Sequence, residues 1–90
     1  MKVENMTSNK GNKIANQFII YDDDKVYFQS YNTKIAMIQD HYIELDAKYW
    51  NYSKTTSKYL NEFFKIFMNI SPKEIKANIK DNTFFLTNLN

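Results

Sequence analysis

The chain has 90 residues with twelve lysines, no arginine and ten acidic residues, which gives a formal net charge of +2. Its length predicts one small domain, and its lack of cysteine excludes disulfides and thiolate metal sites. Because arginine is the usual reader of guanine, its absence argues against sequence-specific DNA recognition. No apolar run reaches the roughly 18 residues of a membrane span, and a cytoplasmic location is the expectation.

The first twelve residues are polar, lack periodicity and contain the single glycine, Gly11. This composition is typical of a loosely attached segment. We therefore predict a flexible leader over residues 1–12 and one small α+β domain over residues 13–90.

Four strands are predicted from alternating side chains and strand-forming residues. They cover residues 15–22, 25–31, 34–38 and 42–45. Aspartate and asparagine punctuate the chain between them, and both residue types favour turns. Because parallel pairing needs a crossover of a dozen or more residues, these short connections predict an antiparallel meander.

A central helix is predicted from about Ser53 to Met68, since its apolar positions follow the spacing of one helix face. These positions are Thr56, Tyr59, Leu60, Phe63, Phe64 and Phe67. A second helix should begin at Ser71, with Pro72 at its first position and Glu74 closing a capping box.

The second helix should end near Lys80, and residues 83–87 read as a last strand. The predicted fold is therefore α+β: a four-stranded antiparallel meander packed on a central helix, with a second short helix and a C-terminal strand.

Five carboxylates are the first candidates for chemistry: Asp22, Asp23, Asp24, Glu44 and Asp46. If adjacent, they could hold a divalent cation or mimic the phosphates of a nucleic acid. The tripeptide from Asp46 to Lys48 also matches the acid-x-Lys pattern of a nuclease class. That architecture requires a helix before its strands and a longer chain, so a metal-dependent nuclease is only a third alternative.

His41, the single histidine, has no serine or cysteine partner in a recognisable constellation. We therefore expect no enzyme activity and no cofactor. Lys54 and Lys58 instead predict a basic face on the central helix, which exposed aromatic side chains could complement as stacking planes for bases.

Three blocks of the sequence carry a resemblance: residues 13–20, residues 27–36 and residues 49–60. The second contains Phe-Gln-Ser-Tyr, and the third contains Trp-Asn-Tyr-Ser-Lys-Thr-Thr-Ser-Lys-Tyr. Over about residues 8–64 the chain resembles very short proteins from phages and mobile elements of low-GC Gram-positive bacteria, a group with no assigned activity. Such proteins usually stop soon after the helix, whereas this chain continues to Asn90.

The resemblance implies a phage accessory protein, and by analogy an inhibitor of the anti-CRISPR type. The leading hypothesis is a non-enzymatic protein that binds a host defence nuclease, such as a CRISPR effector, by steric occlusion or nucleic-acid mimicry. The alternative is a small nucleic-acid-binding protein that uses lysines and exposed aromatic residues. The expected contact residues are Asp22, Asp23, Asp24, Glu44, Asp46, Lys54 and Lys58, and a homodimer is a further alternative.

Overall fold

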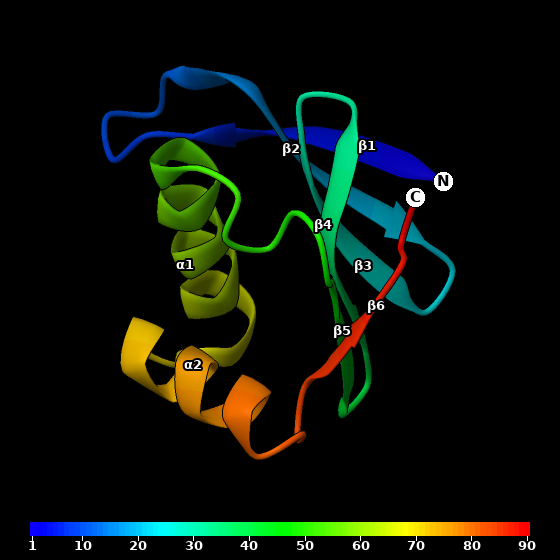
Figure 1. The fold of residues 1–90 in the computed structure, drawn as a ribbon. Helices are drawn as coiled ribbons and strands as arrows, with labels where there is room; N and C mark the ends of the chain where they lie inside the picture. The colour runs from blue at the N-terminus through cyan, green and yellow to red at the C-terminus, as the bar shows by residue number, and fades with distance from the viewer.

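The computed structural model describes residues 1–90 as one sheet with both helices on the same side (Figure 1). The sheet has six strands in the order β1-β2-β3-β4-β5-β6. The elements in chain order are β1 (Lys2–Thr7), β2 (Lys13–Asp22), β3 (Lys25–Ser30), β4 (Thr33–Gln39), β5 (Tyr42–Asp46), α1 (Lys54–Met68), α2 (Pro72–Lys80) and β6 (Phe85–Thr87). Neither helix is long and apolar enough to cross a membrane.

The prediction of a four-stranded meander is wrong, because the sheet gains a strand at each edge. At one edge, β1 pairs antiparallel with β2 from Lys2↔Tyr21 to Asn5↔Phe18, with an irregular register before Thr7. Residues 2–7 belong to the predicted flexible leader, yet Met6 is buried in the core. The strand was missed because Lys2 and Glu4 share the face of Met6, so no apolar alternation marks it.

At the other edge, β6 pairs parallel with β5 in the register Glu44↔Phe85, Leu45↔Leu86 and Asp46↔Thr87. The two helices supply the long connection that parallel pairing requires. The sheet is therefore mixed: five antiparallel strands in sequence order, followed by one parallel edge strand.

Both helices begin where the sequence predicts. The Ser53 hydroxyl accepts from the Thr56 N–H at 3.1 Å and caps α1. In α2, Ser71 Oγ accepts from the Glu74 N–H at 3.2 Å, and Glu74 Oε1 accepts from the Ser71 N–H at 3.1 Å. These reciprocal bonds confirm the capping box.

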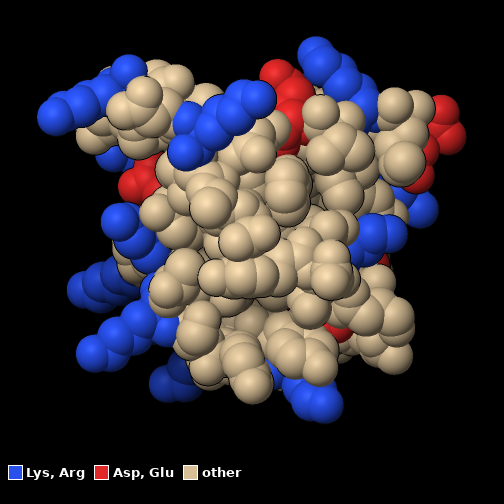
Figure 2. All heavy atoms as spheres, turned by 90° about the horizontal axis from the view of Figure 1, so that it is seen from above, with Lys and Arg blue, Asp and Glu red and all other residues tan.

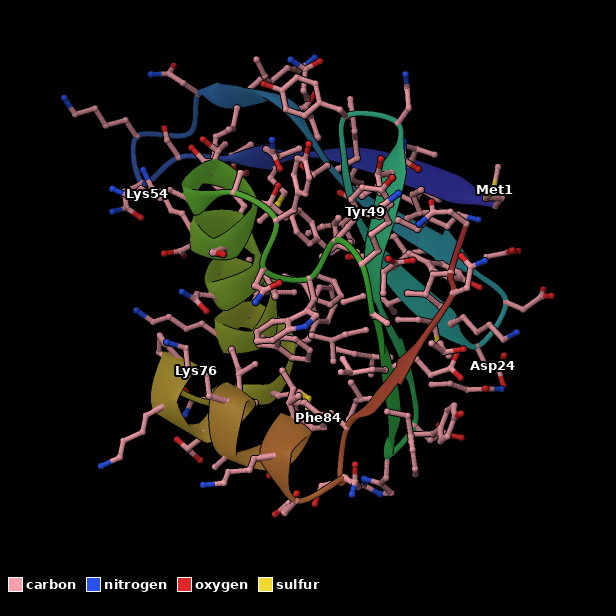
Figure 3. All side chains as sticks on the ribbon, viewed as in Figure 1. Met1, Asp24, Tyr49, Lys54, Lys76 and Phe84 are labelled. Carbon is pink, nitrogen blue, oxygen red and sulfur yellow. The ribbon has the colours of Figure 1, made fainter.

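Phe63 of α1 lies at the centre of the core. Its ring centroid is 5.8 Å from that of Phe28 on β3 and 5.0 Å from that of Phe67. The neighbouring Phe64 stacks on Phe84 at 5.3 Å, which anchors the chain between α2 and β6 (Figure 3). The burial of Leu60, Phe63 and Phe64 confirms the predicted apolar face of the helix.

The hairpin turns use left-handed backbone without glycine. Asp23, Tyr31 and Asp40 have φ angles of 54°, 56° and 52°. Aspartate tolerates this region, whereas a bulky tyrosine adopts it at a cost. The Tyr31 N–H donates to the Asn16 carbonyl at 2.7 Å, which holds the β3–β4 turn against β2.

Candidate functional site

The acidic triplet predicted as a recognition turn lies on the β2–β3 turn, where Asp22, Asp23 and Asp24 are all exposed. The Asp24 carboxylate accepts a hydrogen bond from Gln39 Nε2 at 2.8 Å. Figure 3 places Asp24 on the opposite side of the molecule from Lys54. The acids and the helix lysines therefore form two separate surfaces.

Glu44 lies apart from the triplet. It sits on β5, three strands from Asp22 on β2, which corresponds to about 14 Å at the usual strand spacing. Its carboxylate accepts from the Tyr42 hydroxyl at 2.6 Å, and this hydrogen bond raises the pKa of Tyr42. The predicted five-acid cluster does not assemble.

Asp46 is only 2% exposed, so its carboxylate is not free for a partner. One oxygen accepts from the Lys48 and Tyr49 N–H groups at 3.0 and 3.1 Å. The other accepts from the Leu89 N–H at 3.0 Å and from Asn90 Nδ2 at 2.9 Å. Burial opposes ionisation, but these four hydrogen bonds outweigh it and lower the pKa of Asp46.

Lys54 and Lys58 project from α1 into a shallow polar basin shared with Ser57 and Asn61. The Lys58 ammonium lies 5.3 Å from the centre of the Tyr59 ring. Residues 54–81 contain six of the twelve lysines but only three of the ten acidic residues. Lysine side chains accordingly project from the helical side of the molecule in Figure 2.

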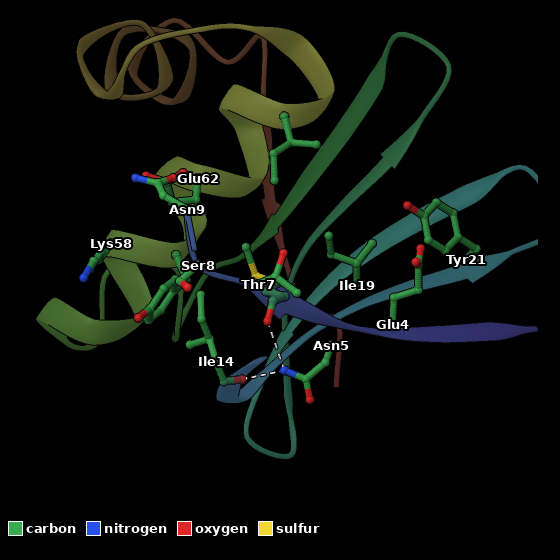
Figure 4. Close-up of a pocket in the computed structure, with 13 residues that line it drawn as sticks. Glu4, Asn5, Thr7, Ser8, Asn9, Ile14, Ile19, Tyr21, Lys58 and Glu62 are labelled. Carbon is green, nitrogen blue, oxygen red and sulfur yellow. Dashed lines mark hydrogen bonds between the residues drawn. The ribbon is translucent and has the colours of Figure 1, made fainter. Parts of the chain in front are cut away.

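The best-formed concavity is a groove of about 430 Å³ between the first hairpin and α1, which we call the β1–α1 groove (Figure 4). Residues 4–9 supply one wall, and Tyr59 and Ile66 of α1 belong to the other. Ile14 and Ile19 of β2 add apolar side chains between them. The groove exists because α1 leaves part of the inner face of β1 and β2 uncovered.

Charged side chains line the β1–α1 groove as well as apolar ones. Glu4 lies on β1, and Lys58 and Glu62 lie on α1, so carboxylates outnumber lysines. Burial raises the pKa of Tyr21, and the neighbouring Glu4 carboxylate raises it further. The charge of the lining therefore favours a ligand that brings a positive group to an apolar surface.

The wall formed by β1 is also an edge of the sheet. β1 has a strand partner only in β2, so one side of its backbone carries no ladder. Where its register with β2 becomes irregular, Asn5 Nδ2 donates to the Ile14 carbonyl at 2.6 Å and to the Met6 carbonyl at 3.1 Å (Figure 4). The Asn5 amide thus fixes the backbone of this wall.

A second, smaller cavity of about 270 Å³ lies beside the first turn of α1. Ser30 Oγ lies 3.5 Å from Thr56 Oγ1, which in turn accepts from Ser53 Oγ at 3.1 Å. Gln17, which pairs with Ser30 across the strands, is buried and its Oε1 has no hydrogen-bond partner. The three sequence blocks that carry the resemblance meet in this region, and the hydroxyls serve the packing of α1 on the sheet.

No group of three or more His, Cys, Asp or Glu side chains is arranged to hold a metal ion. Sequence reasoning missed the β1–α1 groove because it assigned β1 to a leader. Only Val3 and Met6 are apolar in β1, and they lie on opposite faces of the strand, so no alternating pattern signals it in the sequence.

Comparison with known proteins finds no match among curated proteins and none among solved structures. A sequence family does match, over residues 1–81, which span β1 to the end of α2. The matched segment contains both walls of the β1–α1 groove. The chain therefore belongs to DUF8033, a family of unknown function.

Proposed function

We propose that the chain is a non-enzymatic binding protein that receives an extended segment of a protein partner along β1. The observation that carries the proposal is the β1–α1 groove, which runs beside an unpaired strand edge. Strand addition at a sheet edge is a common mode of peptide recognition, in which main-chain hydrogen bonds give affinity and pockets for alternate side chains give specificity.

The lining of the groove defines the segment it would accept. Met6, Ile14 and Ile19 favour apolar side chains at alternate positions of the bound strand. Glu4 and Glu62 favour a lysine or arginine nearby. The expected ligand is an extended peptide with alternating apolar residues and at least one basic residue.

The test is selection of random peptides displayed against the intact chain, followed by measurement of their affinities by isothermal titration. Ile66 is 60% exposed at the groove, and Ile66→Ser should lower the affinity for the selected peptides about tenfold. Tyr52 is 71% exposed and lies outside the groove, so Tyr52→Ser is the matched control. Equal loss of affinity in both variants, or no selected peptide, would overturn the proposal.

Within this function, we propose a host defence nuclease such as a CRISPR effector as the partner and steric occlusion as the mechanism. The support is the resemblance to phage and mobile-element proteins. Mimicry of nucleic acid has weaker support, because Asp46 is buried and Glu44 lies apart from the triplet. A DNA-cleavage assay with the purified effector tests both mechanisms: occlusion requires sensitivity to Ile66→Ser, and mimicry requires sensitivity to replacement of residues 22–24 by asparagine.

Contact with single-stranded nucleic acid is the second candidate. It is supported by lysines that lie over aromatic rings, such as Lys34 at 4.8 Å from the centre of Tyr27, and by the excess of lysine on the helices. Fluorescence anisotropy with a labelled oligonucleotide at two salt concentrations tests it. Replacing Lys54 and Lys58 by glutamine should weaken binding and reduce its salt dependence.

A further inference from the structure

The side of the sheet that faces away from the helices, here called the outer face, has a mostly apolar central row. Strand pairing aligns one row of side chains across the whole sheet on this face: Val3, Ile20, Tyr27, Met37, Glu44 and Phe85. Val3 and Phe85 at its ends are 55% and 46% exposed. Between them Ile20 and Met37 are buried, at 7% and 4%, so the apolar surface of this row is exposed mainly at its two ends. Exposed apolar surface on a sheet face commonly marks an interaction site.

Two further rows flank the central row, two residues away along β2 and β3; on β4 the irregular register makes Lys34 three residues from Met37. One contains Phe18, Gln29 and Lys34, and the other contains Asp22, Lys25 and Gln39. The outer face therefore carries equal numbers of acidic and basic residues in the three rows, but they are distributed unevenly along the strand direction. Its acidic end continues into Asp24, which is held by Gln39, and its opposite end carries Lys34.

We propose that a second copy of the chain packs on the outer face, with the strands of the two sheets running in opposite directions. A two-fold axis that lies along the central row, perpendicular to the strands, reverses the strand direction in the second copy. Lys34 of each copy then lies opposite the Gln39 end of β4 in its partner. Asp24 lies there, so the arrangement creates two equivalent Lys34–Asp24 contacts. The alternative axis, parallel to the strands, would place the two acidic ends against each other.

The size of the face predicts a weak dimer. Six strands at about 4.8 Å spacing and three rows of side chains span roughly 24 by 20 Å, or about 480 Å² per copy. Stable complexes usually bury about 800 Å² per partner, so association should depend strongly on concentration. The β1–α1 groove lies on the opposite side of the sheet and stays open in this dimer.

The same axis brings the two Glu44 carboxylates towards each other, because Glu44 belongs to the central row. Like charges close together oppose association. Glu44→Gln should therefore strengthen the dimer.

Sedimentation equilibrium of the intact chain, from about 10 µM to 1 mM, tests the proposal. Lys34→Glu and Asp24→Lys should each raise the dissociation constant about tenfold, and the double variant, which exchanges the two charges, should recover the wild-type value. Lys54→Glu, the same change on the helical side, should leave it unchanged. Thermal melting followed by circular dichroism confirms that each variant is folded.

A wild-type chain that stays monomeric at 1 mM would overturn the proposal and leave the outer face to another partner. So would a double variant that associates no better than the single variants, or a Lys54→Glu variant that disrupts association as strongly as Lys34→Glu. Stronger association of Glu44→Gln would place the contact on this face, and recovery in the double variant would establish the orientation.

Discussion

Replacing Asp46 by asparagine should lower the free energy of unfolding by about 3 kcal/mol. The carboxylate accepts four hydrogen bonds, two at each oxygen, from backbone and amide donors. Asparagine keeps one acceptor oxygen but places an NH₂ group where the other oxygen met two donors. The loss of two hydrogen bonds to a charged group, at about 1.5 kcal/mol each, gives the estimate.

This loss is a large share of the total, since a chain of this length is expected to be stable by roughly 5–13 kcal/mol. Unfolding in urea, followed by the fluorescence of Trp50, the single tryptophan, measures it. Removal of residues 88–90 takes away both partners of one carboxylate oxygen, together with two hydrogen bonds between Asn90 and the Lys34 backbone. In a double-mutant cycle the two changes should therefore be clearly non-additive.

The effect should also depend on pH. The fold lowers the pKa of Asp46, so its stabilisation is fully present above the unfolded pKa of about 3.9 and is lost as pH falls through the folded pKa. The difference between wild type and Asp46→Asn should be constant from pH 7 to 5 and should narrow below about pH 4. A difference under 1 kcal/mol at pH 7, or one that does not narrow in acid, would refute the assigned role of this carboxylate.

Other substitutions test the packing, the caps and the turns by the same unfolding measurement. Phe63→Ala should cost about 3–5 kcal/mol, because it empties the centre of the core; a melt within a few degrees of wild type would contradict this placement. Ser71→Ala should cost about 1 kcal/mol through loss of the α2 cap, and an unchanged stability would show that the capping box contributes nothing. Tyr31→Asn should add about 0.5–1 kcal/mol by relieving left-handed backbone, and an unchanged or lower stability would show that the tyrosine ring stabilises the turn. Replacing residues 22–24 by asparagine should change stability by less than about 0.5 kcal/mol, and a larger loss would mean that the triplet shapes the turn.

Local sequence signals were enough for the strands from β2 to β5 and for both helices. Alternating side chains mark these strands, aspartate and asparagine mark their turns, and Ser71 with Glu74 marks the start of α2. These elements were predictable because each depends on residues close in the chain. The parallel partner of β6 was not, because only the placement of both helices brings Phe85 beside Glu44.

The candidate site also depends on contacts between residues that are distant in the sequence. The polar inner face of β1 that conceals it from pattern analysis is also what gives the β1–α1 groove its charged wall. Asp46 looked like an available acid because its two tail partners, Leu89 and Asn90, follow 43 and 44 residues later. A carboxylate satisfied by distant backbone cannot be distinguished from an exposed one by its neighbours in sequence.

The topology also orders the way the sheet opens. From β1 to β5 every strand is adjacent to its neighbour in sequence, so each pairing closes only a short loop. β6 pairs only with β5 and returns after residues 47–84. We expect β6 and residues 88–90 to open as one unit while β1 to β5 remain paired. Native-state hydrogen exchange would show this as faster exchange of the β6 amides. Proteases should therefore cleave near β6 before they cleave elsewhere in the sheet. At a pH low enough to protonate Asp46, β6 should detach before the other strands separate.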